Sequence, residues 1–204
     1  GMIGIIDYGG GNLFSLQSSL RYVGADTVVS GDADVLRRAD RLILPGVGAF
    51  ADAARLLRES RLDRVVLQAA DRGTPVLGIC LGMQLLFEKS YEFGEHAGLG
   101  LLRGSVVPME GTIPAELKIP HIGWNSLDFP HEGRLFAGLK EQPYVYFVHS
   151  YYLKAKDPSI VKATTEYGVT IHASVEKGNL FACQFHPEKS STVGLQILKN
   201  FAEI

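Results

Sequence analysis

Short apolar runs alternate with helix-like segments through the first half of the chain, and this alternation limits the fold more than any other feature. The apolar runs are MIGIID (2–7), DTVVS (26–30), RLILPG (41–46) and PVLGI (75–79). Leucines recur at helical spacing after the first run, and residues 32–40 and 51–72 have helical patterns. Strands that alternate with helices pair in parallel through right-handed crossovers. The sequence therefore predicts an α/β fold, with an open, mostly parallel sheet and helices on both faces.

Between Leu99 and Phe185 the pattern changes to repeated strand-like segments, separated by Gly, Pro and Asp. The segments are LLRGSVVPM, YVYFVHSYYL, IVKATTEYG, VTIHASVEKG and NLFACQF. Short strands without helices between them favour antiparallel additions to the central sheet, and a last helix is expected near residues 191–202. No repeat, linker or low-complexity tract interrupts the sequence, so we expect one domain over residues 1–204.

The composition excludes several classes of protein. Hydrophobic residues make up 46% of the chain and charged residues 21%, which argues against disorder. A formal net charge of −2 gives no overall attraction to nucleic acid or to anionic membranes. The first residues form no positively charged leader, and no apolar run approaches the ~18–20 residues of a membrane span. Two cysteines do not make a disulfide scaffold, so we expect a cytoplasmic protein.

Cys80 stands between two glycines where the fourth apolar run gives way to a helix-like segment, GICLGMQ (78–84). Strand, Gly-x-Cys-x-Gly and helix in this order are the cysteine form of a nucleophile elbow, in which Gly78 and Gly82 avoid Cβ collisions. The free N–H groups of a helix N-terminus would raise the thiolate fraction. A buried cysteine beside packing glycines is an equal alternative on this evidence. Cys183 lies mid-strand among apolar residues and is expected in the core.

A nucleophilic thiol needs a base, and His186 is the best placed histidine. It follows the strand NLFACQF, and Glu188 lies two residues further on, where an extended segment would point both side chains the same way. A carboxylate there could orient the imidazole, as a catalytic triad requires. Both His186 and Cys80 follow strands, at the sheet edge where open α/β folds place their sites. Three other histidines are less informative: His96 and His131 in polar loops, where we expect solvent exposure, and His172 within a strand.

Two glycine-rich turns follow the other strands. LPGVGAF (44–50) is a common turn signal by itself, but next to a cysteine elbow its backbone amides could complete an oxyanion hole. YGGGN (8–12) lacks the spacing of a dinucleotide-binding loop, and no Lys-Ser/Thr pair follows it. A phosphate-binding loop is therefore not expected.

With these residues assembled, GICLGMQ and FHPEKSS resemble the class I, triad-type glutamine amidotransferases, which have a flavodoxin-like fold. The resemblance covers nearly the whole chain. Within this family the chain is most similar to the glutaminase subunits of imidazole glycerol phosphate synthases of histidine biosynthesis. Six motifs in order carry that narrower likeness: IIDYGGGNLFSL, LPGVGAF, GICLGMQLLF, PHIGWN, YFVHSYY and CQFHPEKSS.

The resemblance implies roles for individual residues. Cys80 would attack the side-chain amide carbon of L-glutamine and form a thioester, with His186 as acid and base and Glu188 orienting it. The amide of Leu81, with one from Val47 or Gly48, would bind the oxyanion. The residues implied to hold glutamine are Gln84 and Glu92 at its α-amino and α-carboxylate ends, and His149, Ser150 and Tyr151 through their backbone. Neither a metal nor a cofactor is implied.

The resemblance also implies a partner. Ammonia would pass to a TIM-barrel cyclase subunit in a heterodimer, which would activate an otherwise slow glutaminase. The positions implied to face it are Asn12, Trp124, Asn125, Tyr146 and Lys189. Trp124 is the only tryptophan, a residue type enriched at interfaces, although a half-buried core position is an equal alternative.

Two other functions remain open from the sequence. One is the stand-alone glutaminase of another pathway, such as the one serving pyridoxal phosphate synthase, which PHIGWN and Gln84 fit poorly. The other is a non-catalytic cysteine sensor of the DJ-1 type, which also has an elbow cysteine on an α/β sheet. A sensor would not need His186 and Glu188 across a pocket.

Overall fold

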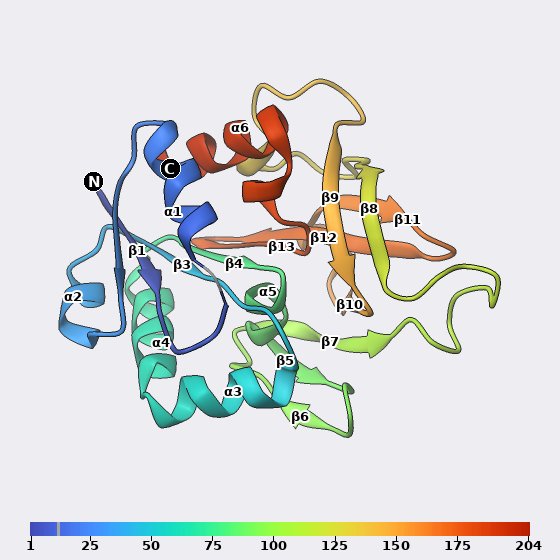
Figure 1. The fold of residues 1–204 in the computed structure, drawn as a ribbon, viewed down its shortest axis with the longest axis horizontal. Helices are drawn as coiled ribbons and strands as arrows, with labels where there is room; N and C mark the ends of the chain where they lie inside the picture. The colour runs from blue at the N-terminus through green and yellow to red at the C-terminus, as the bar shows by residue number, and fades with distance from the viewer. Residues whose placement is uncertain (12) are drawn as a thin grey trace.

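A seven-stranded sheet forms the centre of the computed structural model, which describes residues 1–11 and 13–204 (Figure 1). Its strand order is β11-β12-β13-β4-β3-β1-β2. The strands are β1 (Met2–Ile6), β2 (Asp26–Ser30), β3 (Arg41–Leu44), β4 (Val76–Ile79), β11 (Val161–Glu166), β12 (Thr170–Lys177) and β13 (Leu180–Cys183). Neighbours from β13 to β2 are parallel, and β12 and β11 extend one edge as antiparallel strands. The predicted open, mostly parallel sheet is confirmed.

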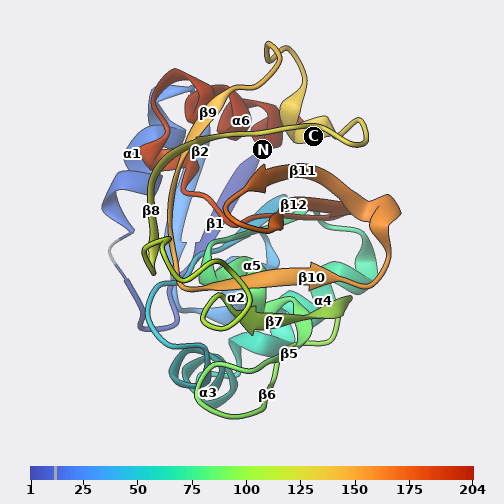
Figure 2. The same ribbon diagram turned by 90° about the vertical axis from the view of Figure 1, so that its right-hand side faces the viewer.

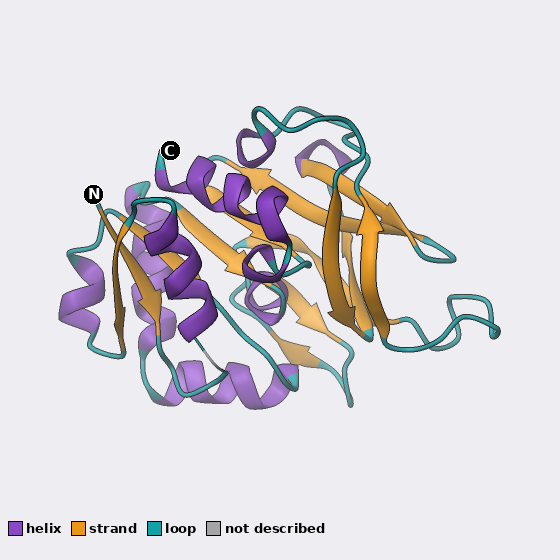
Figure 3. Ribbon diagram, turned by 45° about the horizontal axis from the view of Figure 1, so that its top comes forward, coloured by secondary structure: helices purple, strands orange, loops and turns teal. Residues whose placement is uncertain are grey.

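Helices cover both faces of this sheet (Figure 3). On one face lie α1 (Phe14–Tyr22) and α6 (Ser191–Ala202), and on the other α2 (Ala33–Arg37), α3 (Phe50–Glu59) and α4 (Leu62–Arg72). Side chains of β3 alternate between the two layers: Leu42 and Leu44 pack with α2, α3 and α4, and Ile43 packs with α1 and α6. The two-faced arrangement and the last helix agree with the sequence-based prediction.

The helical stretch predicted over residues 51–72 is two helices rather than one. Arg61 separates α3 from α4 with a left-handed backbone (φ 63°), which ends the first helix and turns the chain. The Ser60 hydroxyl accepts a hydrogen bond from the Leu62 N–H at 3.4 Å and so helps to start α4. Neither Gly nor Pro marks this break, so the pattern of apolar residues did not reveal it.

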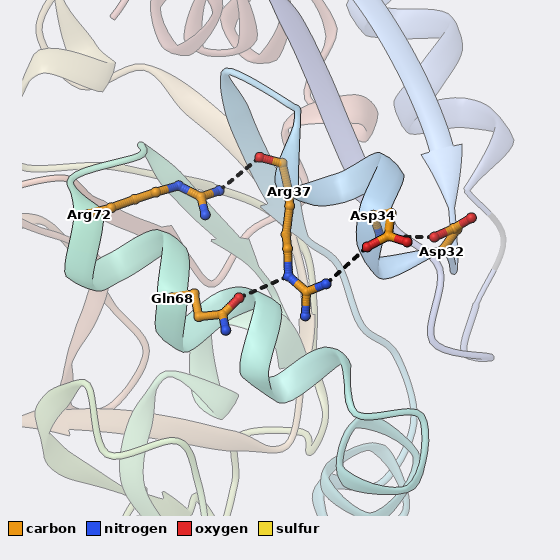
Figure 4. Close-up of polar contacts among 5 residues, drawn as sticks. All are labelled: Asp32, Asp34, Arg37, Gln68 and Arg72. Carbon is orange, nitrogen blue, oxygen red and sulfur yellow. Dashed lines mark hydrogen bonds and ion pairs between the residues drawn. The ribbon is translucent and has the colours of Figure 1, made fainter.

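Polar contacts at the surface join α2 to α4 (Figure 4). The Asp32 carboxylate caps α2 by accepting from the Asp34 N–H at 2.8 Å. The Arg37 guanidinium donates to Gln68 at 3.0 Å and to Asp34 at 3.2 Å, and Arg72 donates to the Arg37 carbonyl at 3.1 Å. Exposed contacts of this kind add little stability, so apolar packing mainly holds this layer.

The predicted antiparallel additions to the central sheet are confirmed for β11 and β12. The prediction was wrong for the other segments, because β13 joins the sheet in parallel with β4 and the strands within 102–108 and 144–155 lie outside it. A separate four-stranded sheet contains β5 (Phe87–Ser90), β6 (His96–Ala97), β7 (Leu102–Pro108) and β10 (Tyr151–Ala155). The strands β8 (His121–Ser126) and β9 (Tyr144–His149) form a two-stranded ribbon (Figure 2). Alternating residues identify strands but not their partners, because pairing depends on contacts distant in the sequence.

Short helices complete the fold. They are α5 (Leu81–Leu85) and the 3-10 helices η1 (Arg134–Phe136), η2 (Pro158–Ile160) and η3 (Pro187–Lys189). Within residues 1–11 and 13–204, no helix combines the length and apolar character that crossing a bilayer requires. Both α5 and η3 follow neighbouring parallel strands, β4 and β13, and this neighbourhood builds the site described next.

Candidate active site

Cys80 occupies a strained turn between β4 and α5. Its backbone has φ 55° and ψ −115°, a conformation that costs a non-glycine residue on the order of 1–3 kcal/mol. The turn is held because the Cys80 N–H donates to the Cys183 carbonyl at 2.8 Å and the Met83 N–H donates to the Cys80 carbonyl at 3.0 Å. The structure therefore contains the nucleophile elbow that the sequence predicts.

The two flanking glycines are required by space. A Cβ atom on Gly82 would lie 1.8 Å from the Leu44 carbonyl oxygen, and one on Gly78 would lie 2.7 Å from the Gly82 oxygen. Both obstacles are backbone atoms, which cannot move aside without shifting β3 or the elbow itself. The predicted reason for Gly78 and Gly82 is thus confirmed.

The helix after the elbow is shorter than the sequence suggests. Only five residues, Leu81–Leu85, are helical before the chain enters β5. A single turn has a small dipole, so it favours a thiolate at Cys80 less than a full helix would. The neighbouring side chains must then provide most of the charge stabilisation.

His186 lies beside Cys80 and carries Glu188 behind it. The His186 Nδ1 and the Glu188 Oε1 are 2.9 Å apart, both largely buried. Burial alone would lower the pKa of His186, but hydrogen bonds to Cys80 and Glu188, with the charges of these groups, raise it to about 9. The predicted extended geometry is wrong, since Pro187–Lys189 form the 3-10 turn η3, yet that turn also brings the two side chains together. These contacts therefore favour the protonated imidazole.

Backbone contacts fix His186 to the ribbon. The His186 N–H donates to the Tyr146 carbonyl at 3.0 Å. The Ser190 hydroxyl donates to the His186 carbonyl at 2.7 Å and accepts from the Tyr146 N–H at 2.9 Å. These hydrogen bonds fix the position of His186 relative to β9, as well as to the end of β13.

A cavity of about 370 Å³ opens over Cys80. Its lining includes the residues predicted for the oxyanion hole and for substrate: Val47, Gly48, Leu81, Gln84, Glu92, His149, Ser150 and Tyr151. Gln84 is buried (5% exposed) and is not the surface residue that an ordinary helical glutamine would be. Glu92 accepts from the Phe50 N–H at 2.6 Å, at the first residue of α3. The structure therefore brings residues from six separate segments to one space.

The amide of Leu81, predicted to bind an oxyanion, is occupied in this structure. It donates to the Gly46 carbonyl at 3.3 Å. Pro45, the residue before Gly46, is held by Tyr8, whose hydroxyl donates to the Pro45 carbonyl at 2.7 Å. Burial, and then the charge of Cys80, raises the pKa of Tyr8 above its usual value. A Cβ on Gly46 would lie 2.6 Å from the Tyr8 hydroxyl, so glycine is needed there. In the turn 45–48, the Gly46 carbonyl faces the Leu81 N–H.

Two buried histidines contact each other beside the segment 149–151 that lines the cavity, and sequence reasoning missed one of them, His121. His149 Nδ1 contacts the Tyr151 carbonyl at 2.9 Å, and its Nε2 lies 3.0 Å from His121 Nδ1. Burial lowers the pKa of His149 to about 3 and that of His121 to about 4, so both rings are neutral at pH 7. The Asn125 amide donates to His121 at 3.3 Å and to the Glu166 carbonyl at 3.0 Å. Asn125, predicted to face a partner, uses its NH2 group in hydrogen bonds within the chain.

The other predicted interface residues are distributed around a second cavity and the ribbon. Trp124 is 52% exposed, which excludes a core position, and its ring lies 6.1 Å from that of Tyr146 in an edge-to-face contact. Lys189 lines a cavity of about 260 Å³ that also borders His186 and Glu188. Asn12 lies outside the described residues. His186 and Val47 line both the cavity over Cys80 and the one beside Lys189.

The remaining histidines and the second cysteine stand apart from the site. His96 and His131 each contact one backbone carbonyl, of Phe93 and Val161 respectively. His172 accepts from the Ala155 N–H at 3.0 Å and joins β12 to the end of β10. Cys183 is fully buried, as predicted, and burial raises the pKa of its thiol. In the part of the chain that the structure describes, no three His, Cys, Asp or Glu side chains are grouped to hold a metal ion.

Gln184 is a pocket residue that sequence reasoning missed. Its side chain is completely buried, and its Nε2 lies 3.6 Å from Cys80 Sγ. The sequence contains one signal for it. Gln184 lies two residues before His186 at the end of β13, and in an extended segment residues i and i+2 point to the same side.

Known proteins resemble the chain over its full length. Residues 4–204 match the family model described as "Glutamine amidotransferase class-I". The chain is 50% identical over 203 residues to "Imidazole glycerol phosphate synthase subunit HisH" of Caldanaerobacter subterraneus subsp. tengcongensis, with 100% of this chain and 98% of that protein covered. It is 52% identical over 198 residues to the protein of the same name from Aquifex aeolicus, with 97% and 94% covered.

Solved structures share the fold. "Crystal structure of glutamine amidotransferase" superposes with a TM-score of 0.77 at 20% identity and covers 100% of both chains. "Structure of PurLQS from Thermotoga maritima" has a TM-score of 0.77 at 22% identity and covers 99% of this chain and 97% of the other. At these identities the likeness concerns the fold alone.

Proposed function

This chain belongs to the class I glutamine amidotransferases and, within them, to the HisH family of glutaminases, and we propose that it hydrolyses L-glutamine at Cys80 to supply ammonia to a cyclase subunit. One observation carries the assignment of the site. Cys80, His186 and Glu188 form a row: Cys80 and His186 line the cavity that Gln84 and Glu92 also line, and Glu188 contacts His186 Nδ1 at 2.9 Å. A cysteine sensor would need neither the base nor this pocket.

The row supports thioester chemistry. Cys80 Sγ forms a bond to the side-chain amide carbon, and negative charge moves to the amide oxygen. The His186 imidazolium gives its proton to the nitrogen, and ammonia leaves with the electrons of the C–N bond. Neutral His186 then takes a proton from water, whose oxygen attacks the thioester carbon. The C–S bond breaks, which returns the thiolate and releases glutamate.

The cavity walls suggest how glutamine is held. Gln84 and Glu92 line the same cavity as Cys80 and bind the amino-acid end of the substrate in this proposal. The backbone from His149 to Tyr151 lines the same space, and the His121–His149 pair keeps this strand in place through the Tyr151 carbonyl. The proposed pose puts the amide carbon of glutamine at Cys80.

The turn 45–48 controls the reaction in this proposal. The Leu81 N–H donates to Gly46, so it is not free to bind a developing oxyanion. A rigid peptide unit carries its C=O and N–H on opposite sides, so turning the Gly46–Val47 unit would withdraw the carbonyl and present the Val47 N–H instead. Two donors would then face the oxyanion, which is worth about 2.7–4 kcal/mol per donor in related chemistry. The isolated chain is therefore expected to be a slow glutaminase.

The partner in this proposal is the cyclase subunit of imidazole glycerol phosphate synthase, in a cytoplasmic heterodimer with lyase activity. The exposed Trp124 and the half-buried Tyr146 beside it, with Lys189 at the second cavity, provide the docking surface. Binding there lies close to His186 and to the turn 45–48. Ammonia would leave on the side of the second cavity, away from bound glutamate.

Glutamate release measures the proposal directly. We expect low turnover by the chain alone and at least a 100-fold rise with the cyclase subunit and its nucleotide ligand. Cys80→Ala is expected to abolish turnover under both conditions, while Cys183→Ala, the matched control, retains it. Persistent turnover by Cys80→Ala would remove Cys80 as nucleophile. Full activity without the cyclase would contradict the control by turn 45–48.

A further inference from the structure

Gln184 has no part in the chemistry described so far, although it touches the nucleophile. Its side chain is completely buried, and both ends of its amide are used. The Nε2 lies 3.6 Å from Cys80 Sγ, and the Oε1 accepts from Gln84 Nε2 at 3.0 Å. Burying an amide costs more free energy than burying an apolar side chain of the same size, so the hydrogen bonds of this amide must compensate for that cost.

The direction of this amide follows from its neighbours. Gln84 Nε2 also lies 3.4 Å from the Tyr151 carbonyl, which can only accept a hydrogen bond. Gln84 therefore turns its NH2 group toward this corner, and the atom of Gln184 that faces it must be an acceptor, the oxygen. The NH2 group of Gln184 is then left facing Cys80 Sγ. The chain of bonds runs one way, from the substrate wall to the nucleophile.

The partner of that NH2 group changes with ionisation. A neutral thiol is a weak acceptor, whereas a thiolate accepts a charge-assisted hydrogen bond that is stronger. The single turn of α5 gives little help to an anion, and the Leu81 N–H is taken by Gly46. Besides His186, the donor directed at the sulfur in this structure is Gln184.

We propose that Gln184 is a catalytic hydrogen-bond donor that stabilises the thiolate of Cys80, with Gln84 holding its amide in the donating orientation. The sulfur lies between two donors, the imidazolium of His186 on one side and the Gln184 amide on the other. When Sγ attacks glutamine, its negative charge passes to the amide oxygen and this hydrogen bond weakens. Gln184 thus increases the population of the nucleophile at neutral pH and slightly reduces its intrinsic reactivity.

The opposing effects give a signature that a structural role lacks. We expect the rate of Cys80 alkylation by iodoacetamide, measured against pH with peptide mass spectrometry, to rise with a midpoint that reports the thiolate. In Gln184→Met the midpoint should move up by about one pH unit, the size expected when a hydrogen bond to a charged group is lost. The rate on the high-pH plateau should stay equal or increase.

Two further variants separate this role from packing. Gln184→Glu keeps an acceptor for Gln84 but puts a carboxylate oxygen toward the sulfur, so its midpoint should rise at least as far. Ser174→Ala is the control, because its buried hydroxyl donates from β12 to the Ala182 carbonyl of the neighbouring strand β13 at 2.7 Å, a hydrogen bond that does not involve Cys80. It should leave the midpoint unchanged even if it lowers the melting temperature.

Folding is checked by circular dichroism, and either Gln184 variant that folds decides the question. An unchanged midpoint in a folded Gln184→Met or Gln184→Glu protein overturns the proposal, and so does a lower plateau without a shift. The inference builds on Cys80 as the proposed nucleophile, but alkylation needs no turnover. A shifted midpoint in a protein that fails to hydrolyse glutamine would therefore retain the Gln184 role and reject the glutaminase, so the two failures are distinguishable.

Discussion

Two cysteines lie on neighbouring strands and differ in nearly everything that decides their chemistry. Cys183 ends β13 within a regular ladder, paired with Ile79 on one side and Ser174 on the other. Cys80 comes one residue after the end of β4, in the turn with φ 55°. Both are buried, at 0% and 8% exposure, so burial does not separate them. What separates them is one residue of chain beyond the sheet, which is enough to bring the side chain to a cavity.

The surroundings of the two sulfurs differ accordingly. Burial, and then the negative charges of Glu188 and Cys80, raise the pKa of Cys183 well above its usual value. Cys80 instead contacts the protonated imidazole of His186 and the amide of Gln184. The first environment favours a neutral thiol, and only the second places hydrogen-bond donors beside the sulfur. Reactivity is thus a property of the position that the strand end creates, not of the residue type.

The largest expected effect is on thiol reactivity. At pH 7.5 iodoacetamide should modify Cys80 on the order of 100-fold faster than Cys183, or more, because only Cys80 combines an accessible sulfur with donors to the thiolate. Peptide mass spectrometry after timed alkylation gives both rates in one experiment. Similar rates at the two sites would end the contrast between the strand and the elbow.

A smaller effect is expected from crowding the elbow. Gly82→Ala should lower the free energy of unfolding by roughly 3 kcal/mol, because the new methyl group would meet the Leu44 carbonyl. Gly10→Ala is the matched control: the nearest atoms to its Cβ are 3.6 Å away, and the cost should stay within about 0.5 kcal/mol. Denaturant unfolding measures both. Equal costs would mean that the elbow tolerates a side chain at Gly82.

The smallest expected effect compares glycine with alanine at the two cysteines. At position 80 the Cys80→Gly protein should be about 1 kcal/mol more stable than Cys80→Ala, because glycine relieves the positive φ. At position 183 the order should reverse by about the same amount, since glycine weakens a strand. Thermal and denaturant unfolding of the four variants give the answer. The same order at both positions would show that strain at Cys80 is negligible.

Part of this site could be predicted because local sequence carries it. Gly78 and Gly82 report backbone contacts through the absence of a Cβ, and His186 with Glu188 lies within three residues of chain. The alternation of apolar runs with helix-like segments in the sequence likewise predicted the parallel strands. These features share a cause that is visible in one short window of sequence.

Other features have causes that no single window contains. The orientation of the Gly46–Val47 peptide depends on Tyr8, which lies some forty residues earlier, and no side chain at 46 or 47 records it. The break at Arg61 follows from packing two helices on one face, without glycine or proline. Gln184 and His121 look like ordinary polar residues until the strands bring them to Cys80 and His149.

The hydrogen bond from the Cys80 N–H to the Cys183 carbonyl has a consequence for mutational scanning. Position 183 serves the elbow through its backbone oxygen, which every amino acid possesses. Alanine scanning would therefore score Cys183 as dispensable. The backbone carbonyl at position 183 still helps to hold the turn at Cys80, and replacing the side chain neither removes nor detects that contribution.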